Sequence, residues 1–214
     1  LLVASSGLDL ELQVDDAGTV VREWNTLGEP AWQRFSKAVD YRRVASTKPH
    51  LSHPNHLFLI DDEVWVTRFE QRDAISMADP SRRIDIGIER VHDGVVVGEQ
   101  VYFTTVDAHV AVASTSSLKV EHVYDLNTAS GQDMERHFGW CRGIHVDGRF
   151  AWVGYSRLRL TRIRENVSWV RWGFKRFAPT RIACYDLERG CCVQEIDLQA
   201  HGLDAVFSIL PSES

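Results

Sequence analysis

The sequence predicts an all-β fold built from repeated four-stranded antiparallel units. Three stretches, residues 56–67, 92–104 and 142–154, follow one pattern: an apolar strand with a polar head, a short turn, and a strand with an aromatic residue among apolar ones. A four-stranded unit that recurs along a chain is the signature of a β-propeller. We therefore expect residues 1–214 to form a single β-propeller domain.

Two more strands are expected after each of these hairpins. Third strands are predicted at 73–79, 109–113 and 181–186, where the alternation of side chains suits a sheet buried unequally on its two faces. Fourth strands are predicted at 83–87, 120–126 and 192–198. Residues that favour chain reversal, such as Asp79-Pro80-Ser81, separate the third strands from the fourth. These segments complete three blades.

The two ends of the chain are predicted to contribute partial blades. Residues 1–5, 9–14 and 20–24 fit a second, a third and a fourth strand, and residues 201–209 fit another innermost strand. About four blades are thus visible, which is the small end of the known range. Because the chain begins without Met inside a predicted strand, we expect an N-terminally truncated part of a larger ring, with six blades preferred.

The composition is that of a globular protein, with 44% hydrophobic and 25% charged residues over 214 positions. No stretch approaches the length of a transmembrane helix, and the opening residues lack the basic flank of a signal peptide. The four cysteines form no CxxC pair, which favours reduced thiols. The sequence therefore predicts a soluble protein of the cytoplasm.

The polar heads of the innermost strands are the candidate site. Innermost strands of a propeller surround a central channel, so their starts converge although they are far apart in the sequence. The residues that we expect to bind a ligand there are Asn55, His56, His92, Asp93, Arg142, His201 and Asp204. Such a set would combine imidazoles, carboxylates and a guanidinium, and it favours a small polar or anionic ligand.

Three interpretations of these heads stay open. Asp93, Asp204, His92 and His201 are candidate ligands for a divalent metal ion, the one cofactor considered. A histidine could instead act as a general base while Arg142 holds an anionic substrate group. In the third interpretation the side chains only cap strand ends and bind water.

Histidines also recur at positions 50, 53 and 56. This spacing would align them on a helix, but Pro49 and Pro54 favour a loop that enters a strand. Of the three histidines, His56 beside Asn55 is the one that we expect to face the channel.

The His53-Pro54-Asn55-His56 entry into the hairpin at 61–67, together with Gly7-Leu8-Asp9 and Glu23-Trp24, resembles bacterial propellers of the arylsulfotransferase-like type. The blade pattern extends the resemblance over most of the chain, although the motifs are short. The family implies a catalytic histidine that receives a sulfuryl group, and His56 is the matching position. A more distant resemblance is to metal-dependent gluconolactonases, which share a site at the channel mouth of a six-bladed ring.

A basic insertion is predicted within one blade, at residues 157–180. From Arg157 to Arg181 the chain has eight basic residues and one acid, Glu165, although the formal net charge of the whole is −6. The arginines expected to contact an anion are Arg157, Arg159, Arg162, Arg164 and Arg171.

Helical spacing of apolar residues between 166 and 177 suggests a short amphipathic helix within this insertion. It could pack on a neighbouring blade, cover the channel mouth or contact a membrane surface peripherally. Nucleic acid is the least favoured partner because the chain is acidic. Three function classes therefore remain: a ligand-binding propeller, a propeller enzyme that is a metal-assisted hydrolase or a sulfuryl transferase, and an interaction scaffold.

Overall fold

The computed structural model describes residues 1–131, 139–157 and 178–211, and in these residues the fold is all-β. Fifteen strands form four antiparallel sheets in which each strand pairs with its neighbour in the chain. The first sheet has three strands, β1 (Leu2–Ser5), β2 (Leu10–Val14) and β3 (Val20–Asn25). The second has four, β4 (Pro54–Ile60), β5 (Glu63–Arg68), β6 (Asp73–Ser76) and β7 (Arg83–Asp85).

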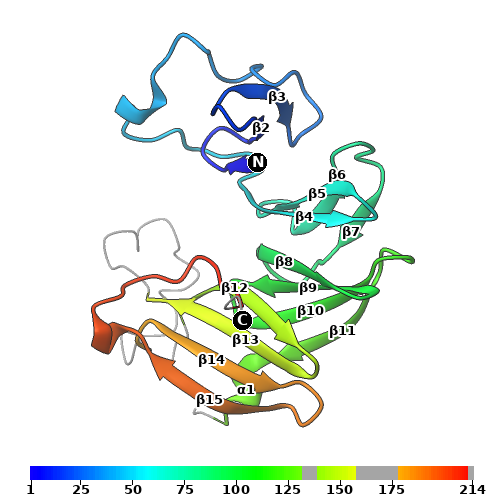
Figure 1. Ribbon diagram of the computed structural model, residues 1–214, viewed down its shortest axis with the longest axis vertical. Helices are drawn as coiled ribbons and strands as arrows, with labels where there is room; N and C mark the ends of the chain where they lie inside the picture. The colour runs from blue at the N-terminus through cyan, green and yellow to red at the C-terminus, as the bar shows by residue number, and fades with distance from the viewer. Residues whose placement is uncertain (132–138, 158–177, 212–214) are drawn as a thin grey trace.

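The third and fourth sheets repeat the plan of the second. The third consists of β8 (Val91–Val97), β9 (Gln100–Thr105), β10 (His109–Ser114) and β11 (Val120–Asp125), and the one-turn helix α1 (Leu126–Ala129) follows it. The fourth consists of β12 (Trp140–Asp147), β13 (Phe150–Ser156), β14 (Arg181–Asp186) and β15 (Cys191–Asp197). The repeated four-stranded unit that the sequence predicted is therefore confirmed, and the sheets resemble propeller blades (Figure 1).

Two-residue turns set the register of the first hairpin in each four-stranded sheet. Asp61 and Asp62 join β4 to β5 and have φ angles of 50° and 61°, in the left-handed region that such turns require. Gly98 and Gly148 supply a positive φ at the corresponding turns of the third and fourth sheets. Because the turn fixes the pairing, the aromatic and apolar residues of the second strands face neighbouring sheets.

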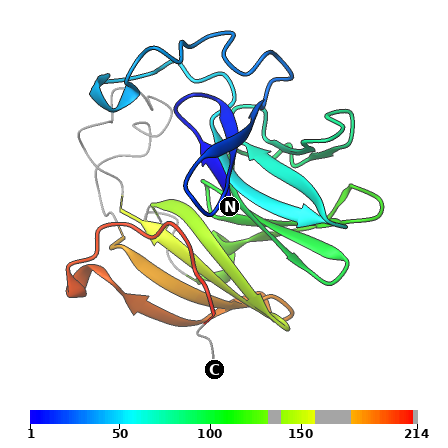
Figure 2. The ribbon, with the colours of Figure 1, turned by 45° about the horizontal axis from the view of Figure 1, so that its top comes forward.

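The hydrophobic core lies between successive sheets. One cluster joins the second sheet to the third and contains Phe58, Trp65 and Phe103, and another joins the third to the fourth and contains Val110, Tyr155 and Tyr185. The first strands lie next to one another, β4 beside β8 and β8 beside β12, while β1 lies beside β4. Figure 2 shows the sheets side by side in this order.

The first strand of each four-stranded sheet has a register shift near its start. Asn55 and His56 together stand opposite Thr67, and His92 and Asp93 together stand opposite Thr104. The fourth sheet has its register shift at the same place, between Arg142 and Ile144. Such bulges twist a strand and change the direction of its side chains, which is why they are common beside binding sites.

The C-terminal segment differs from its prediction as an innermost strand at 201–209. His201 ends a 3-10 helix at Gln199–His201, and the residues from 203 to 211 form no strand. The segment nevertheless returns to the fourth sheet, where Val206 exchanges two hydrogen bonds with the Ser156 hydroxyl and Ser208 lies against Gly143. Among the described residues no strand pairs with this segment, so its backbone cannot form the hydrogen bonds of a sheet.

Most of the basic insertion, and all of the expected amphipathic helix, lie outside the described residues. Of the arginines expected to contact an anion, Arg157 is described and is exposed. Within the described parts of the chain, no helix is long and apolar enough to cross a membrane.

Thr67 gives a test of the contact between sheets. Its hydroxyl accepts the His56 N–H at 3.0 Å and donates to the His92 carbonyl at 2.8 Å, which links the second sheet to the third. We expect Thr67→Val to lower the free energy of unfolding by about 1–3 kcal/mol, since two buried backbone groups lose their partner. Urea unfolding measures this loss. Thr115→Val, which removes a single bond to the Glu99 carbonyl, is the control, and an equal loss in both variants would contradict the expectation.

Candidate functional site

The bulge at the head of β8 holds a paired imidazole and carboxylate. Nδ1 of His92 is hydrogen bonded to Oδ1 of Asp93, and the Asp93 backbone N–H donates to the Thr104 hydroxyl at 3.2 Å. The side chains of His92 and Asp93 are 12% and 7% exposed. A carboxylate that accepts the Nδ1 proton fixes the ring orientation and leaves Nε2 as the acceptor. The pair is therefore held rigidly at the edge of the core.

His56, at the head of β4, lies against the same carboxylate. Its Nδ1 is 4.0 Å from Oδ2 of Asp93, and 36% of its side chain is exposed. Partial burial lowers the pKa of His56, and Asp93 acts in the opposite direction. Asp93 thus stands between two imidazoles that come from different sheets.

His53 precedes β4 and joins this group. Burial, together with the nearby charges of His50, His92 and Arg142, lowers the pKa of His53 to about 4, against the opposing effect of Asp9. The charges of His92 in the third sheet and Arg142 in the fourth therefore act on the His53 ring. We call His53, His56, His92, Asp93 and Arg142 the head cluster.

Aromatic rings border the head cluster on the side of Arg142. The Arg142 guanidinium carbon lies 5.2 Å from the Phe207 ring centre and 6.0 Å from that of Trp140. The Trp140 ring is 6.5 Å from Phe69, which in turn meets the His53 ring edge-on at 5.2 Å. Cation–π contact can hold a guanidinium in place. The aromatic rings therefore help to fix the position of the Arg142 cation.

The structure brings the predicted heads His56, His92 and Asp93 together, and the charge of Arg142 acts on His53 beside them. Asn55 lies beside the cluster, and its side-chain amide donates to the Val91 carbonyl at 3.4 Å, an interaction between sheets. His201 and Asp204 are exposed and follow β15, at the end of the fourth sheet. Within the described residues no three His, Cys, Asp or Glu side chains are placed to hold a metal ion. The four metal candidates therefore do not form one site.

Sequence reasoning missed the contributions of His53, Phe69 and Phe207. The spacing of His50, His53 and His56 was a usable signal, but the preference for His56 alone left His53 out. Phe69 follows a second strand and Phe207 lies in the C-terminal segment, so only the packing of sheets brings Phe69 to Trp140 and Phe207 to Arg142. The sequence contains no local pattern that could predict these contacts.

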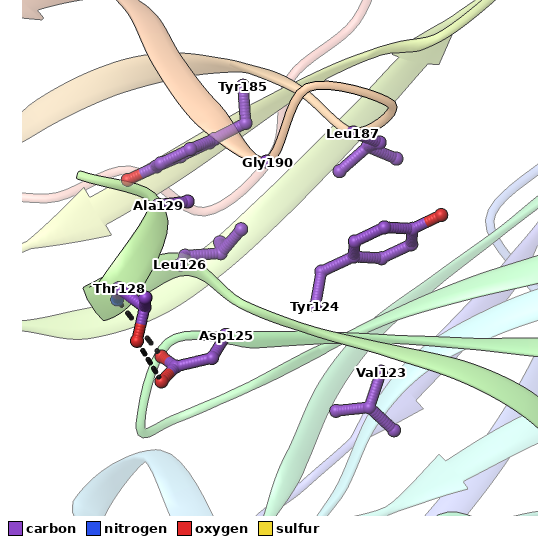
Figure 3. A pocket seen from close by; sticks show the side chains of 9 residues that line it. All are labelled: Val123, Tyr124, Asp125, Leu126, Thr128, Ala129, Tyr185, Leu187 and Gly190. Carbon is purple, nitrogen blue, oxygen red and sulfur yellow. Dashed lines mark hydrogen bonds between the residues drawn. The ribbon is translucent and has the colours of Figure 1, made fainter. Parts of the chain in front are cut away.

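A separate pocket of about 270 Å³ lies between the third and fourth sheets (Figure 3). None of the predicted site residues lines it. Its lining is mainly apolar and includes Tyr124, Leu126, Tyr185 and Leu187. The carboxylate in the lining, Asp125, caps α1 by accepting hydrogen bonds from the backbone of the helix and the Thr128 hydroxyl. The Asp125 carboxylate therefore stabilises the start of α1.

Comparison with known proteins shows no family for this chain. No protein-family model matches it, and no curated protein matches it. Among solved structures it is similar to the computationally designed Ika4 protein, with 10% identity and a TM-score of 0.45 over 78% of this chain and 84% of that one. It is also similar to the computationally designed Ika8 protein, with 12% identity and a TM-score of 0.45 over 77% of this chain and 42% of that one. The resemblances to arylsulfotransferases and gluconolactonases stay predictions.

The low pKa of His53 makes stability depend on pH. Between pH 6.5 and about 4 the unfolded chain binds a proton that the folded protein does not, so the free energy of unfolding falls as the pH is lowered. We expect a decrease of about 1–2 kcal/mol from pH 7 to pH 5 from this residue, allowing for solvent screening.

Urea unfolding at both pH values measures the difference. His53→Asn should reduce the decrease, and His201→Gln, at an exposed position, should leave it unchanged. A decrease of the same size in the His53 variant would contradict the assignment.

Proposed function

We propose that the four sheets are successive blades of a β-propeller and that the head cluster binds a small anionic ligand at the channel mouth. The proposal rests on His56 and Asp93, which come from different sheets and lie against each other, and on Arg142 of a third sheet, whose charge acts on His53. If these side chains only capped their own strands, His56 and His92 would not be expected to lie against the same carboxylate, that of Asp93. The location in the cytoplasm also stays a prediction.

The chemistry of the cluster favours an anion with an apolar or sugar-like body. Arg142 supplies a permanent positive charge and a planar set of donors, which suit a carboxylate or a sulfate group. Imidazoles that burial keeps neutral can donate one hydrogen bond each. The faces of Trp140 and Phe207 offer apolar surface for the rest of the molecule.

Arg142→Gln is the direct test of this binding site. Titration calorimetry with sulfate and with 4-nitrophenyl sulfate should show binding by the parent protein and a loss of affinity of about tenfold or more in the variant, since a charge-assisted contact is lost. Arg189→Gln is the matched control, because Arg189 is 70% exposed and its nearest acid is Asp186 in the fourth sheet.

The same titration has a pH dependence with a defined sign. Because burial lowers the pKa of His53 to about 4 and also lowers that of His56, both rings are neutral from pH 8 to pH 7 and the affinity should be nearly constant there, rising only at lower pH as the rings take up protons. Equal affinity of the parent protein and Arg142→Gln, or no binding of either probe, would contradict the proposal.

A second candidate function is general-base catalysis, which the His92–Asp93 pair favours. The carboxylate holds the imidazole in one tautomer with Nε2 as a proton acceptor, the arrangement found in oriented catalytic bases. In this hypothesis Arg142 would hold the anionic group of a substrate. This general-base role differs from the one that the family resemblance implies for His56, which is to receive a sulfuryl group.

Hydrolysis of 4-nitrophenyl sulfate tests this second function. If the parent protein turns over the ester, His92→Gln should lower the rate by about 100-fold, whereas His56→Gln should lower it less. His145→Gln, on β12 but two residues beyond the head, is the control. A larger loss in His56→Gln would return the catalytic role to that residue.

A further inference from the structure

Asp9, at the end of the first sheet, organises the loop that precedes β4. Its carboxylate is fully buried and accepts the backbone N–H groups of Leu51 at 3.0 Å, Ser52 at 3.0 Å and His53 at 2.7 Å. Arg34 also donates to it. Four donors that converge on one buried carboxylate fix the position of the loop backbone, since three of them are backbone N–H groups of consecutive residues.

His50 fixes the ring of His53 within this loop. The two Nδ1 atoms are 2.7 Å apart, while the ring centres are 4.8 Å apart with planes at 11°. Each nitrogen therefore lies between the two ring centres, so the rings meet edge to edge and the hydrogen bond runs in their common plane. A shared proton between two neutral rings requires that one Nδ1 donates and the other accepts.

Thr47 contacts the other ring nitrogen of His50. Its hydroxyl is 3.2 Å from Nε2 of His50. A hydroxyl can donate or accept, and in the arrangement in which it donates to this Nε2 the His50 proton is on Nδ1 and Nδ1 of His53 is the acceptor. His53 then carries its own proton on Nε2, the ring nitrogen not used in the pair.

The surroundings of His53 connect it to the head cluster. Its ring meets Phe69 edge-on, and His92 and Arg142 both lie within electrostatic range. Its φ angle of 53° is in the left-handed region, so the Asp9 contacts hold a backbone conformation that a residue with a Cβ avoids when unsupported. The side chain is thus placed by both its backbone and its ring.

We propose that Asp9 and His50 are positioning residues that present the Nε2–H of His53 as a neutral hydrogen-bond donor to the anion at the head cluster. This inference rests on the proposed binding function and assigns His53 as a ligand contact within it. A neutral donor beside the Arg142 guanidinium adds directional selectivity for an anion without adding a second buried charge.

The tautomer can be measured without any ligand. Long-range ¹H–¹⁵N NMR of the uniformly ¹⁵N-labelled protein at pH 7 distinguishes protonated from bare ring nitrogens. We expect His53 to carry its proton on Nε2 and His50 to carry its proton on Nδ1. A proton on Nδ1 of His53, or a mixture of both tautomers in the parent protein, would overturn the inference.

Two substitutions at His50 separate positioning from simple packing. His50→Leu should let His53 populate both tautomers and should weaken sulfate binding by about fivefold. His50→Asn can place an amide N–H near the former Nδ1 position, so it should restore the single tautomer and most of the affinity. Equal behaviour of the two variants would count against the role of His50.

Asp9→Asn tests whether the hydrogen bonds from the backbone of residues 51–53 to Asp9 position His53. Asp73→Asn is its matched control, because Asp73 is equally buried and binds Arg68 and Arg83 without touching the loop at 51–53. Both variants should lose stability, but only Asp9→Asn should shift the His53 ring resonances and weaken sulfate binding. The same effect on His53 in both variants would overturn the positioning role.

The outcomes distinguish this inference from the function on which it rests. If sulfate does not bind although His53 carries the expected Nε2 proton, the proposed function fails while the tautomer supports the positioning. If sulfate binds in an Arg142-dependent manner and His53 has the other tautomer, the function stands and this inference fails.

Discussion

The site depends on the bulge at the start of the first strand in each four-stranded sheet. It places two residues opposite one, Asn55 and His56 against Thr67 in the second sheet and His92 and Asp93 against Thr104 in the third. The threonine hydroxyls bond the displaced backbone, and Thr67 also reaches the next sheet. Without the extra residue, strict alternation would send every second head side chain into the core.

Buried acids near this constraint differ in their hydrogen-bond partners. Asp9 accepts hydrogen bonds from backbone amides, and Asp93 is hydrogen bonded to an imidazole. Glu11, only two residues from Asp9, is 1% exposed and neither carboxyl oxygen has a hydrogen-bond partner within the described residues. Burial raises the pKa of Glu11 to about 9, so this side chain is neutral at pH 7.

The pocket beside α1 and the head cluster differ in physical character. The pocket beside α1 has apolar walls and an acid already used as a helix cap. The head cluster instead combines a cation, a carboxylate and imidazoles from neighbouring sheets, bordered by Phe69, Trp140 and Phe207. Titratable groups from several elements, with pKa values shifted by burial and by one another, are what a polar ligand site requires. This contrast supports placing the function at the head cluster.

The sequence by itself determined the strands, their order and the heads at positions 56, 92, 93 and 142, because alternation and turn chemistry act over a few residues. It did not determine that residues 203–211 lack a strand, since pairing needs a partner strand. Only the tertiary structure decided that Asp9 holds the loop of His53 from 44 positions away, and that Phe207 covers Arg142. Such contacts depend on how whole sheets pack, and no local pattern encodes them.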